Sequence, residues 1–131
     1  MIDTSALVTI LFNEPERRAF TKAIEEAESR LLSAASLVEA SMVIESRFGG
    51  EGVRQLDLLI DRAGIEIVAV DEEQAHVARR AFSQYGKGRH PAGLNYGDCF
   101  AYALARVLGE TLLYKGEDFV HTDLTPHLPL H

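Results

Sequence analysis

Residues 94–106 read LNYGDCFAYALAR, and this stretch decides how the rest of the chain is expected to fold. Asn95 suits the N-terminal cap of a helix, because its side chain can accept a hydrogen bond from a free backbone N–H. Small and apolar residues then continue to Leu108, and Gly109 is a good residue for a left-handed helix end. A helix that is apolar on most sides is expected in the middle of a domain.

Asp98 falls in the first turn of this predicted helix. The helix dipole stabilises an acid at that position, which is the ordinary explanation for its presence. A carboxylate on a buried helix is nevertheless costly unless it is paired or binds a metal ion. This stretch alone leaves both explanations open.

The composition is that of an ordinary globular protein. The 131 residues suffice for a single domain, 1–131, with one hydrophobic core, and 47% of them are hydrophobic. No stretch is long and apolar enough to span a membrane, and the first residues lack the basic start of a signal peptide. We therefore expect a cytoplasmic protein.

The charge and the cysteine content exclude some classes of function. The net charge of −7 argues against broad electrostatic binding of nucleic acid, but it allows a nuclease whose acids gather at a metal site, or a basic protein partner. Cys99 is the only cysteine, so the chain has no internal disulfide and no cysteine-based metal cluster. On an apolar helix, Cys99 is expected to be a small buried residue rather than a nucleophile.

Short apolar runs alternate with amphipathic segments along the chain. The expected strands lie at Ile2 and at residues 31–35, 65–70 and 111–114. The helices expected before the central one cover residues 4–11, 15–27, 36–48, 53–63 and 71–85, and residues 36–39 and 71–74 match capping boxes. This order predicts an α/β fold, a three-layer sandwich with a short central parallel sheet flanked by helices.

Four acids occupy equivalent places in this predicted topology. Asp3 follows the first strand, Glu39 lies in the first turn of the helix after the second strand, Asp98 begins the helix before the last strand, and Asp118 follows that strand. All four should lie at the carboxyl edge of the sheet, where open α/β sheets place their sites. Crowded carboxylates raise one another's pKa, and a cation is the usual compensation. Oxygen ligands suit Mg²⁺ or Mn²⁺, and no His or Cys spacing fits zinc.

Each acid also has a purely structural explanation. Glu39 can complete a capping box with Ser36, and Asp3 and Asp118 can serve as loop acids in Asx-turns. The functional interpretation rests on the convergence of all four acids on one edge.

Four motifs in chain order carry a family resemblance: IDTSAL at 2–7, SLVEA at 36–40, LNYGDC at 94–99 and LYKGEDF at 113–119. Together they resemble the PIN-domain ribonucleases, most closely the VapC toxins of bacterial type II toxin–antitoxin pairs. The resemblance implies a PIN-like fold and a Mg²⁺- or Mn²⁺-dependent endoribonuclease that cuts RNA, often tRNA or ribosomal RNA. It also implies a homodimer and an antitoxin that covers the active site.

The resemblance also implies roles for individual residues. By matching motif, the four acids discussed above are the metal-binding and catalytic residues. Ser5 matches the hydroxyl that assists at the first motif, and Asn95 and Asp123 match auxiliary positions.

A glycine-rich loop precedes the central helix and contains Lys87, Arg89 and His90. With Arg79 and Arg80 nearby, it is the one local concentration of positive charge, which makes it the best candidate for contacting the RNA backbone. It lacks interleaved aromatic residues, so we expect it to position RNA rather than to read sequence. A solvated loop without a role is the alternative.

Three other functions remain as alternatives. A metal-free nuclease would use His90 and His121 as acid and base. A receiver-like signalling domain would need a phosphate-accepting acid after a central strand, but Asp57, the acid nearest mid-chain, falls inside a helical pattern. A non-catalytic module would keep the fold and bind only a partner.

Overall fold

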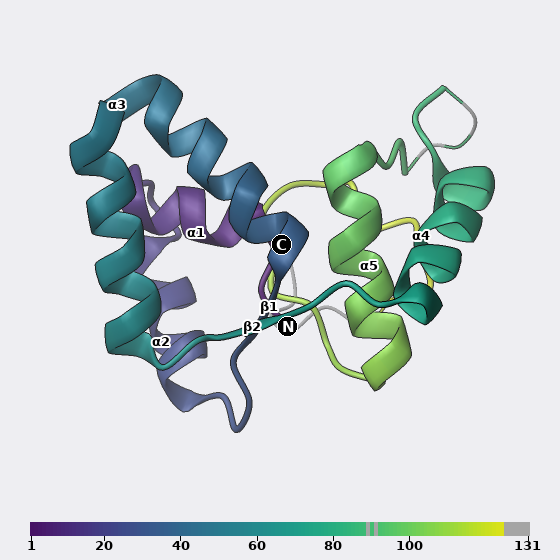
Figure 1. Ribbon diagram of the computed structural model, residues 1–131, viewed down its shortest axis with the longest axis horizontal. Coiled ribbons are helices and arrows are strands. Elements are labelled where there is room, and N and C mark those ends of the chain that lie inside the picture. Colours follow the sequence, from purple (N-terminus) through teal and green to yellow (C-terminus); the bar gives the residue numbers. More distant parts are fainter. Residues whose placement is uncertain (89, 91, 125–131) are drawn as a thin grey trace.

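The computed structural model describes residues 1–88, 90 and 92–124. Its elements are α1 (Thr4–Leu11), α2 (Arg17–Glu26), β1 (Leu31–Ser33), α3 (Ala34–Ala63), β2 (Glu66–Val68), α4 (Glu72–Tyr85) and α5 (Tyr96–Leu108). Figure 1 shows α1, α2 and α3 on one side of the short strands and α4 and α5 on the other. The predicted α/β fold, a parallel sheet between two layers of helices, is confirmed.

The regular part of the sheet is small. β1 and β2 pair in parallel, with Leu31 opposite Glu66. Ile2 forms a single parallel bridge with Leu113, and the Ile2 N–H donates to the Leu31 carbonyl at 2.9 Å. The chain start therefore lies between β1 and the segment around Leu113. In place of the strands expected at Ile2 and at 111–114, the described residues form only isolated bridges there, and Asp3 already caps α1.

The helix after β1 begins earlier than predicted. Ser33 caps α3 by accepting a hydrogen bond from the Ala35 N–H at 3.2 Å, so the helix begins at Ala34. The prediction that Ser36 and Glu39 form a capping box is therefore wrong. Glu39 lies in the second turn of α3, and the Ser36 Oγ is buried without a hydrogen-bond partner among the described residues.

A kink replaces the predicted loop between two helices. The sequence predicts an end at Gly49 and Gly50, and Gly49 indeed has φ 67° and ψ −158°, a conformation that glycine adopts without strain. The helix resumes at once, so α3 continues to Ala63. Gly64, at φ 65°, ends it in the left-handed conformation.

The core divides into two clusters, one on each face of the sheet. Leu112 and Tyr114 pack with α4 and α5, while Leu113 packs with the residues of α1, α2 and α3. This alternation is the period of an extended strand with both faces buried. Helix α5 lies in the middle as predicted, with Ala103 and Leu104 both 0% exposed. None of the helices in the described part of the chain is long and apolar enough to cross a membrane.

Candidate active site

Asp3 is held at the point where the first strand turns into α1. Its Oδ2 accepts hydrogen bonds from the Ser5 N–H at 3.0 Å and the Ser5 Oγ at 2.6 Å. The residue is 3% exposed, and Oδ1 has no well-aligned hydrogen-bond partner among the described residues. Burial raises the pKa of Asp3 to about 6, the Glu39 charge adds to the rise, and the Ser5 hydrogen bonds oppose it. Asp3 therefore presents one buried, unused oxygen.

Asp98 and Asn95 form the capping box of α5. The Asn95 Oδ1 accepts from the Asp98 N–H at 2.9 Å, and the Asp98 Oδ2 accepts from the Asn95 N–H at 3.0 Å. Burial is the main reason that the pKa of Asp98 is raised, and the charge of Asp3 and a hydrogen bond with Asp118 raise it further. The Asp98 and Asp118 carboxyl groups therefore lie close enough to act on one another. Asp98 is therefore both a helix cap and a member of the acidic group.

Glu39 reaches the same place from α3. A Cβ built on Gly97 would overlap the Glu39 carboxylate, so that carboxylate lies against the first turn of α5. Its charge also acts on Asp3. The structure thus brings together all four predicted acids: Asp3 interacts with Glu39 and Asp98, and Asp98 interacts with Asp118.

The Ser5 hydroxyl joins the first motif to the last one. While it donates to Asp3, its oxygen accepts from the Lys115 backbone N–H at 2.9 Å. The Lys115 ammonium group pairs with Glu14 and, at 3.0 Å, with the Glu16 Oε2. Ser5 therefore fixes both the Asp3 carboxylate and the segment that leads to Asp118.

Sequence reasoning missed two residues that shape the site. Thr4 donates from its Oγ1 to the Ser36 carbonyl at 3.2 Å, which ties the start of α1 to the helix that carries Glu39. Gly97 leaves the space that the Glu39 carboxylate fills. The sequence offered one signal for Gly97: a glycine inside a helix costs stability, so its presence there suggests that the position has no room for a side chain. Nothing in the sequence paired Thr4 with Ser36.

Asp123 contacts α5 rather than the four acids. Its Oδ1 accepts from the Tyr102 hydroxyl at 2.6 Å, and its Oδ2 lies 3.3 Å from the Arg106 Nε. Both partners lie further along α5 than Asp98, so the contacts hold the C-terminal segment onto that helix.

The glycine-rich loop is closed at its base by backbone hydrogen bonds. The Lys87 N–H donates to the Leu94 carbonyl, and the Leu94 N–H donates to the Tyr85 carbonyl, each at 2.9 Å. The Lys87 side chain is exposed. The His90 Nδ1 accepts from the Ala92 N–H at 3.0 Å, which gives this histidine a role in the loop itself. Arg89, the third predicted contact with RNA, lies outside the described residues.

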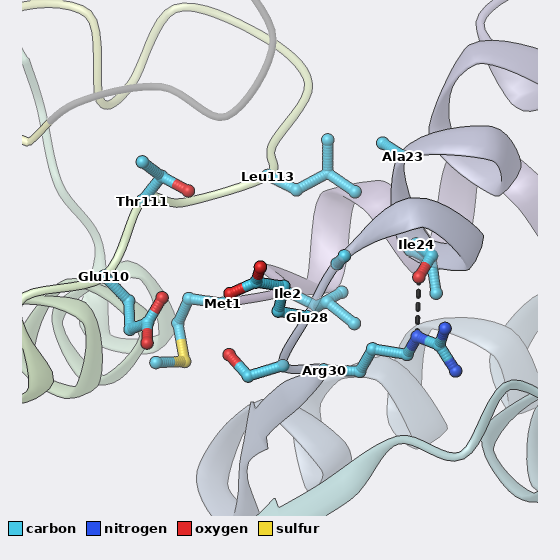
Figure 2. A pocket seen from close by; sticks show the side chains of 11 residues that line it. Met1, Ile2, Ala23, Ile24, Glu28, Arg30, Glu110, Thr111 and Leu113 are labelled. Carbon is cyan, nitrogen blue, oxygen red and sulfur yellow. Dashed lines mark hydrogen bonds between the residues drawn. The ribbon is translucent and has the colours of Figure 1, made fainter.

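A separate cavity of about 300 Å³ opens at the opposite edge of the strands (Figure 2). Met1, Ile2 and Arg30 line it, and these residues precede or begin the strands. The Arg30 guanidinium stabilises the fold, because it donates hydrogen bonds to the Ile24 carbonyl at 2.6 Å and the Ala63 carbonyl at 2.8 Å. We therefore assign the acidic group, and not this cavity, as the candidate active site.

The four acids, as the structure places them, do not have an arrangement that would hold a metal ion. Within residues 1–88, 90 and 92–124, no three His, Cys, Asp or Glu side chains are positioned to hold a metal ion. The pKa values of Asp3 and Asp98 are both raised, first by burial and then by the neighbouring acids, and a bound cation would offset this cost.

Known proteins match this chain over nearly its whole length. The PIN domain family matches residues 1–124. Ribonuclease VapC30 of Mycobacterium tuberculosis H37Rv is 56% identical over 124 residues, which cover 95% of each chain. The crystal structure of Mycobacterium tuberculosis VapC20, a toxin that cleaves the sarcin-ricin loop, has a similar fold, with a TM-score of 0.77 and 12% identity over 95% of each chain. A toxin–antitoxin complex from Klebsiella pneumoniae matches with a TM-score of 0.71 and 16% identity over 98% of each chain. The chain therefore belongs to the PIN-domain family, among the VapC ribonucleases.

Proposed function

We propose that this protein is a metal-dependent endoribonuclease in which Asp3, Glu39, Asp98 and Asp118 bind Mg²⁺ or Mn²⁺. The observation that supports this most strongly is the convergence of the four carboxyl groups, from four separate segments of the chain, at one edge of the sheet. Family membership supports the ribonuclease activity.

The donor set suits a hard divalent cation. Carboxylate oxygens are ligands that Mg²⁺ and Mn²⁺ prefer. The buried Asp3 Oδ1 lacks a hydrogen-bond partner among the described residues, which is costly for a carboxylate unless something binds it. A cation would also lower the raised pKa of Asp98, because ligand carboxyls bind metals in their ionised form.

A metal held by such acids lowers the pKa of a bound water and neutralises charge on the scissile phosphate. The protein's own residues orient the ligands. Ser5 holds Asp3 through two hydrogen bonds, and Asn95 holds Asp98 through the reciprocal cap. Burial of Asp3 and Asp98 strengthens the electrostatic interactions within the site, because water no longer screens them.

The basic loop supplies a place for the RNA backbone in this proposal. Lys87 and His90, with Arg89, would contact phosphates beside the acids, and the exposed Lys87 is free to reach outwards. Arg79 and Arg80 on α4 are exposed near the loop in sequence and extend the same positive region. Such contacts position an RNA without selecting its sequence.

The protein would act in the cytoplasm as the toxin of a toxin–antitoxin pair. Similarity to a toxin–antitoxin complex and membership of the VapC ribonucleases support an antitoxin as partner. The net charge of −7 favours a partner with a basic segment. A homodimer is expected from the family resemblance.

The test is cleavage of labelled RNA by purified, antitoxin-free protein with Mg²⁺, with Mn²⁺ and with EDTA. We expect metal-dependent cleavage that Asp98→Asn abolishes and that the control Asp57→Asn preserves, because Asp57 is an exposed acid of α3. Cleavage that survives both EDTA and Asp98→Asn would refute the proposal and turn attention to His90 and His121. If no RNA is cut, calorimetric titration with Mn²⁺ decides whether the acids bind metal, and the absence of binding would leave a non-catalytic module.

A further inference from the structure

Ser36 carries a buried hydroxyl that the fold does not use. The residue is 1% exposed, and its Oγ has no hydrogen-bond partner among the described residues. Serine inside a helix often donates to the carbonyl one turn back, but Ser36 makes no such bond within the described part of the chain. A buried hydroxyl without a partner destabilises the folded state, because it has given up its hydrogen bonds to water.

The local structure does not require serine at position 36. Ser33 already caps α3, so the helix needs no second capping hydroxyl. The nearby positions 34, 35 and 40 are all alanine, which has the highest helix propensity and no polar side-chain atom. Alanine at position 36 would keep a small side chain and remove the unpartnered hydroxyl. The serine therefore carries a cost that the simplest replacement would avoid.

Ser36 adjoins the segments that carry two of the four acids. Residues three apart on a helix are neighbours on its surface, so Ser36 and Glu39 share one face of α3. The Thr4 Oγ1 donates to the Ser36 carbonyl at 3.2 Å, and Thr4 directly follows Asp3. Figure 1 shows α1, which begins at Thr4, on the same side of the strands as α3. The charge of Glu39 raises the pKa of Asp3, so these two acids are close to one another as well.

The Ser36 Oγ and the Asp3 Oδ1 are both buried without a hydrogen-bond partner among the described residues. The bond from Thr4 to Ser36 joins the two segments that carry these oxygens. Each unpartnered oxygen costs free energy, and one occupant that bonds both would remove the two costs together. A hydrated divalent cation suits both oxygens, because Mg²⁺ binds carboxylate oxygens directly and keeps several of its waters.

A hydroxyl supplies a function that the acids lack. An ionised carboxylate only accepts hydrogen bonds, whereas a serine hydroxyl both donates and accepts. Ser36 can therefore accept from a water on the ion and donate to a neighbouring carboxylate, and Glu39 is the carboxylate on its own helix face. Such a pair of bonds would fix the direction of that water relative to the acids.

We propose that Ser36 is a positioning residue of the metal site, whose hydroxyl hydrogen-bonds a water carried by the cation at Asp3 and Glu39. This role rests on the proposed function and adds to it a group that is neither an acid nor part of the first motif. It accounts for a buried serine that no element of the described fold requires. Loss of the hydroxyl should therefore have opposite effects on the metal-free fold and on metal binding.

The test compares Ser36→Ala with the wild type in two measurements. Thermal unfolding with EDTA should show a Tm raised by roughly 3 °C or more, because the variant no longer buries an unpartnered hydroxyl. Isothermal titration with Mn²⁺ should show an affinity weakened roughly 10- to 100-fold, the usual effect of losing a group that orients a metal ligand. Ser36→Thr, which keeps the hydroxyl, should restore most of the affinity for Mn²⁺.

Ser46→Ala is the matched control, because it makes the same change on the same helix. The Ser46 hydroxyl is exposed and donates to the Val43 carbonyl at 2.8 Å, well beyond Glu39 along α3. This control also corrects for the higher helix propensity of alanine. We expect Ser46→Ala to keep the wild-type affinity for Mn²⁺ and to change the Tm less than Ser36→Ala does.

The outcomes separate the role of Ser36 from the proposed function. Mn²⁺ binding that Asp98→Asn abolishes and Ser36→Ala leaves unchanged would overturn the role of Ser36 while the metal site stands. A lower Tm of Ser36→Ala with EDTA would also overturn it, because the hydroxyl would then have a partner within the fold. If the wild-type protein binds no Mn²⁺, the proposed metal site fails, and the role of Ser36 fails with it.

Discussion

The carboxylate of Glu39 lies in the space that a side chain at position 97 would occupy, so Glu39 and Gly97 are complementary across the contact between α3 and α5. The two residues are far apart in sequence, and neither motif explains the other by itself. The absence of a Cβ at Gly97 lets Glu39 approach the turn that carries Asp98. This contact makes the fourth acid part of the group.

Gly97→Ala should displace Glu39 and weaken metal binding. The added methyl overlaps the end of a flexible side chain, which can move away, and alanine favours the helix by about 0.5–1 kcal/mol. We therefore expect affinity for Mn²⁺ to fall roughly 10- to 100-fold while thermal stability is kept or slightly raised. Isothermal titration calorimetry and thermal unfolding measure the two effects. Gly50→Ala is the control, because a Cβ there meets nothing within 4 Å; equal metal affinity in both variants would contradict the prediction.

The metal-free protein should lose stability as the pH rises through the range from about 4 to 6. Burial raises the pKa of Asp3 in the folded state from 3.8 to about 6, so the folded state binds a proton that the unfolded state has released. Asp3→Asn removes this penalty and should stabilise the metal-free protein at pH 7 by up to about 3 kcal/mol, a gain that shrinks as the pH falls towards 4. Urea unfolding of the wild type and of Asp3→Asn at several pH values, with EDTA present, measures this difference in the free energy of unfolding. A gain that does not change with pH would show that Asp3 titrates normally.

Ser5→Ala should impair the site more than the fold. The variant loses the hydrogen bonds from the Ser5 hydroxyl to Asp3 and from the Lys115 N–H to that hydroxyl. The hydrogen bonds from Ser5 lower the pKa of Asp3. Loss of the bond from the Ser5 hydroxyl should therefore raise that pKa further and move the acid limb of the pH–rate profile to higher pH. The stability cost should be about 1 kcal/mol for each hydrogen bond. Ser46→Ala, which removes a hydroxyl bonded only within α3, should leave the profile in place.

Asp123→Ala should affect stability rather than metal binding. Asp123 is bonded to Tyr102 and Arg106, so its removal frees the C-terminal segment from α5 and should lower the free energy of unfolding by about 1–2 kcal/mol. Affinity for Mn²⁺ should stay at the wild-type value. A large loss of metal affinity at unchanged stability would instead give Asp123 the auxiliary role that the resemblance implies. Tyr102→Phe, which removes the same hydrogen bond from the other side, should reproduce part of the stability change only.

Helix-capping preferences predicted the ends of α5 correctly, because the capping residues stand next to the helix in the sequence. Asn95 caps α5, and Gly109, at φ 66°, ends it in the left-handed conformation, both as predicted. The same preferences failed at Ser36, because Ser33 satisfies the identical requirement three residues earlier, where the short strand β1 ends. Sequence cannot rank two serines three residues apart as caps, since the choice depends on where pairing with β2 stops.

The sequence by itself determined the order of strands and helices, the burial of α5 and the edge at which the four acids gather. These follow from hydrophobic periodicity, helix caps and the geometry of parallel connections, which act within a few residues or within one topological unit. Only the tertiary structure decided that Glu39 fits against Gly97, that Ser5 joins Asp3 to Lys115, and that Thr4 joins α1 to α3 at Ser36. Those relationships join side chains from different elements, and their positions depend on how the helices pack rather than on any local preference.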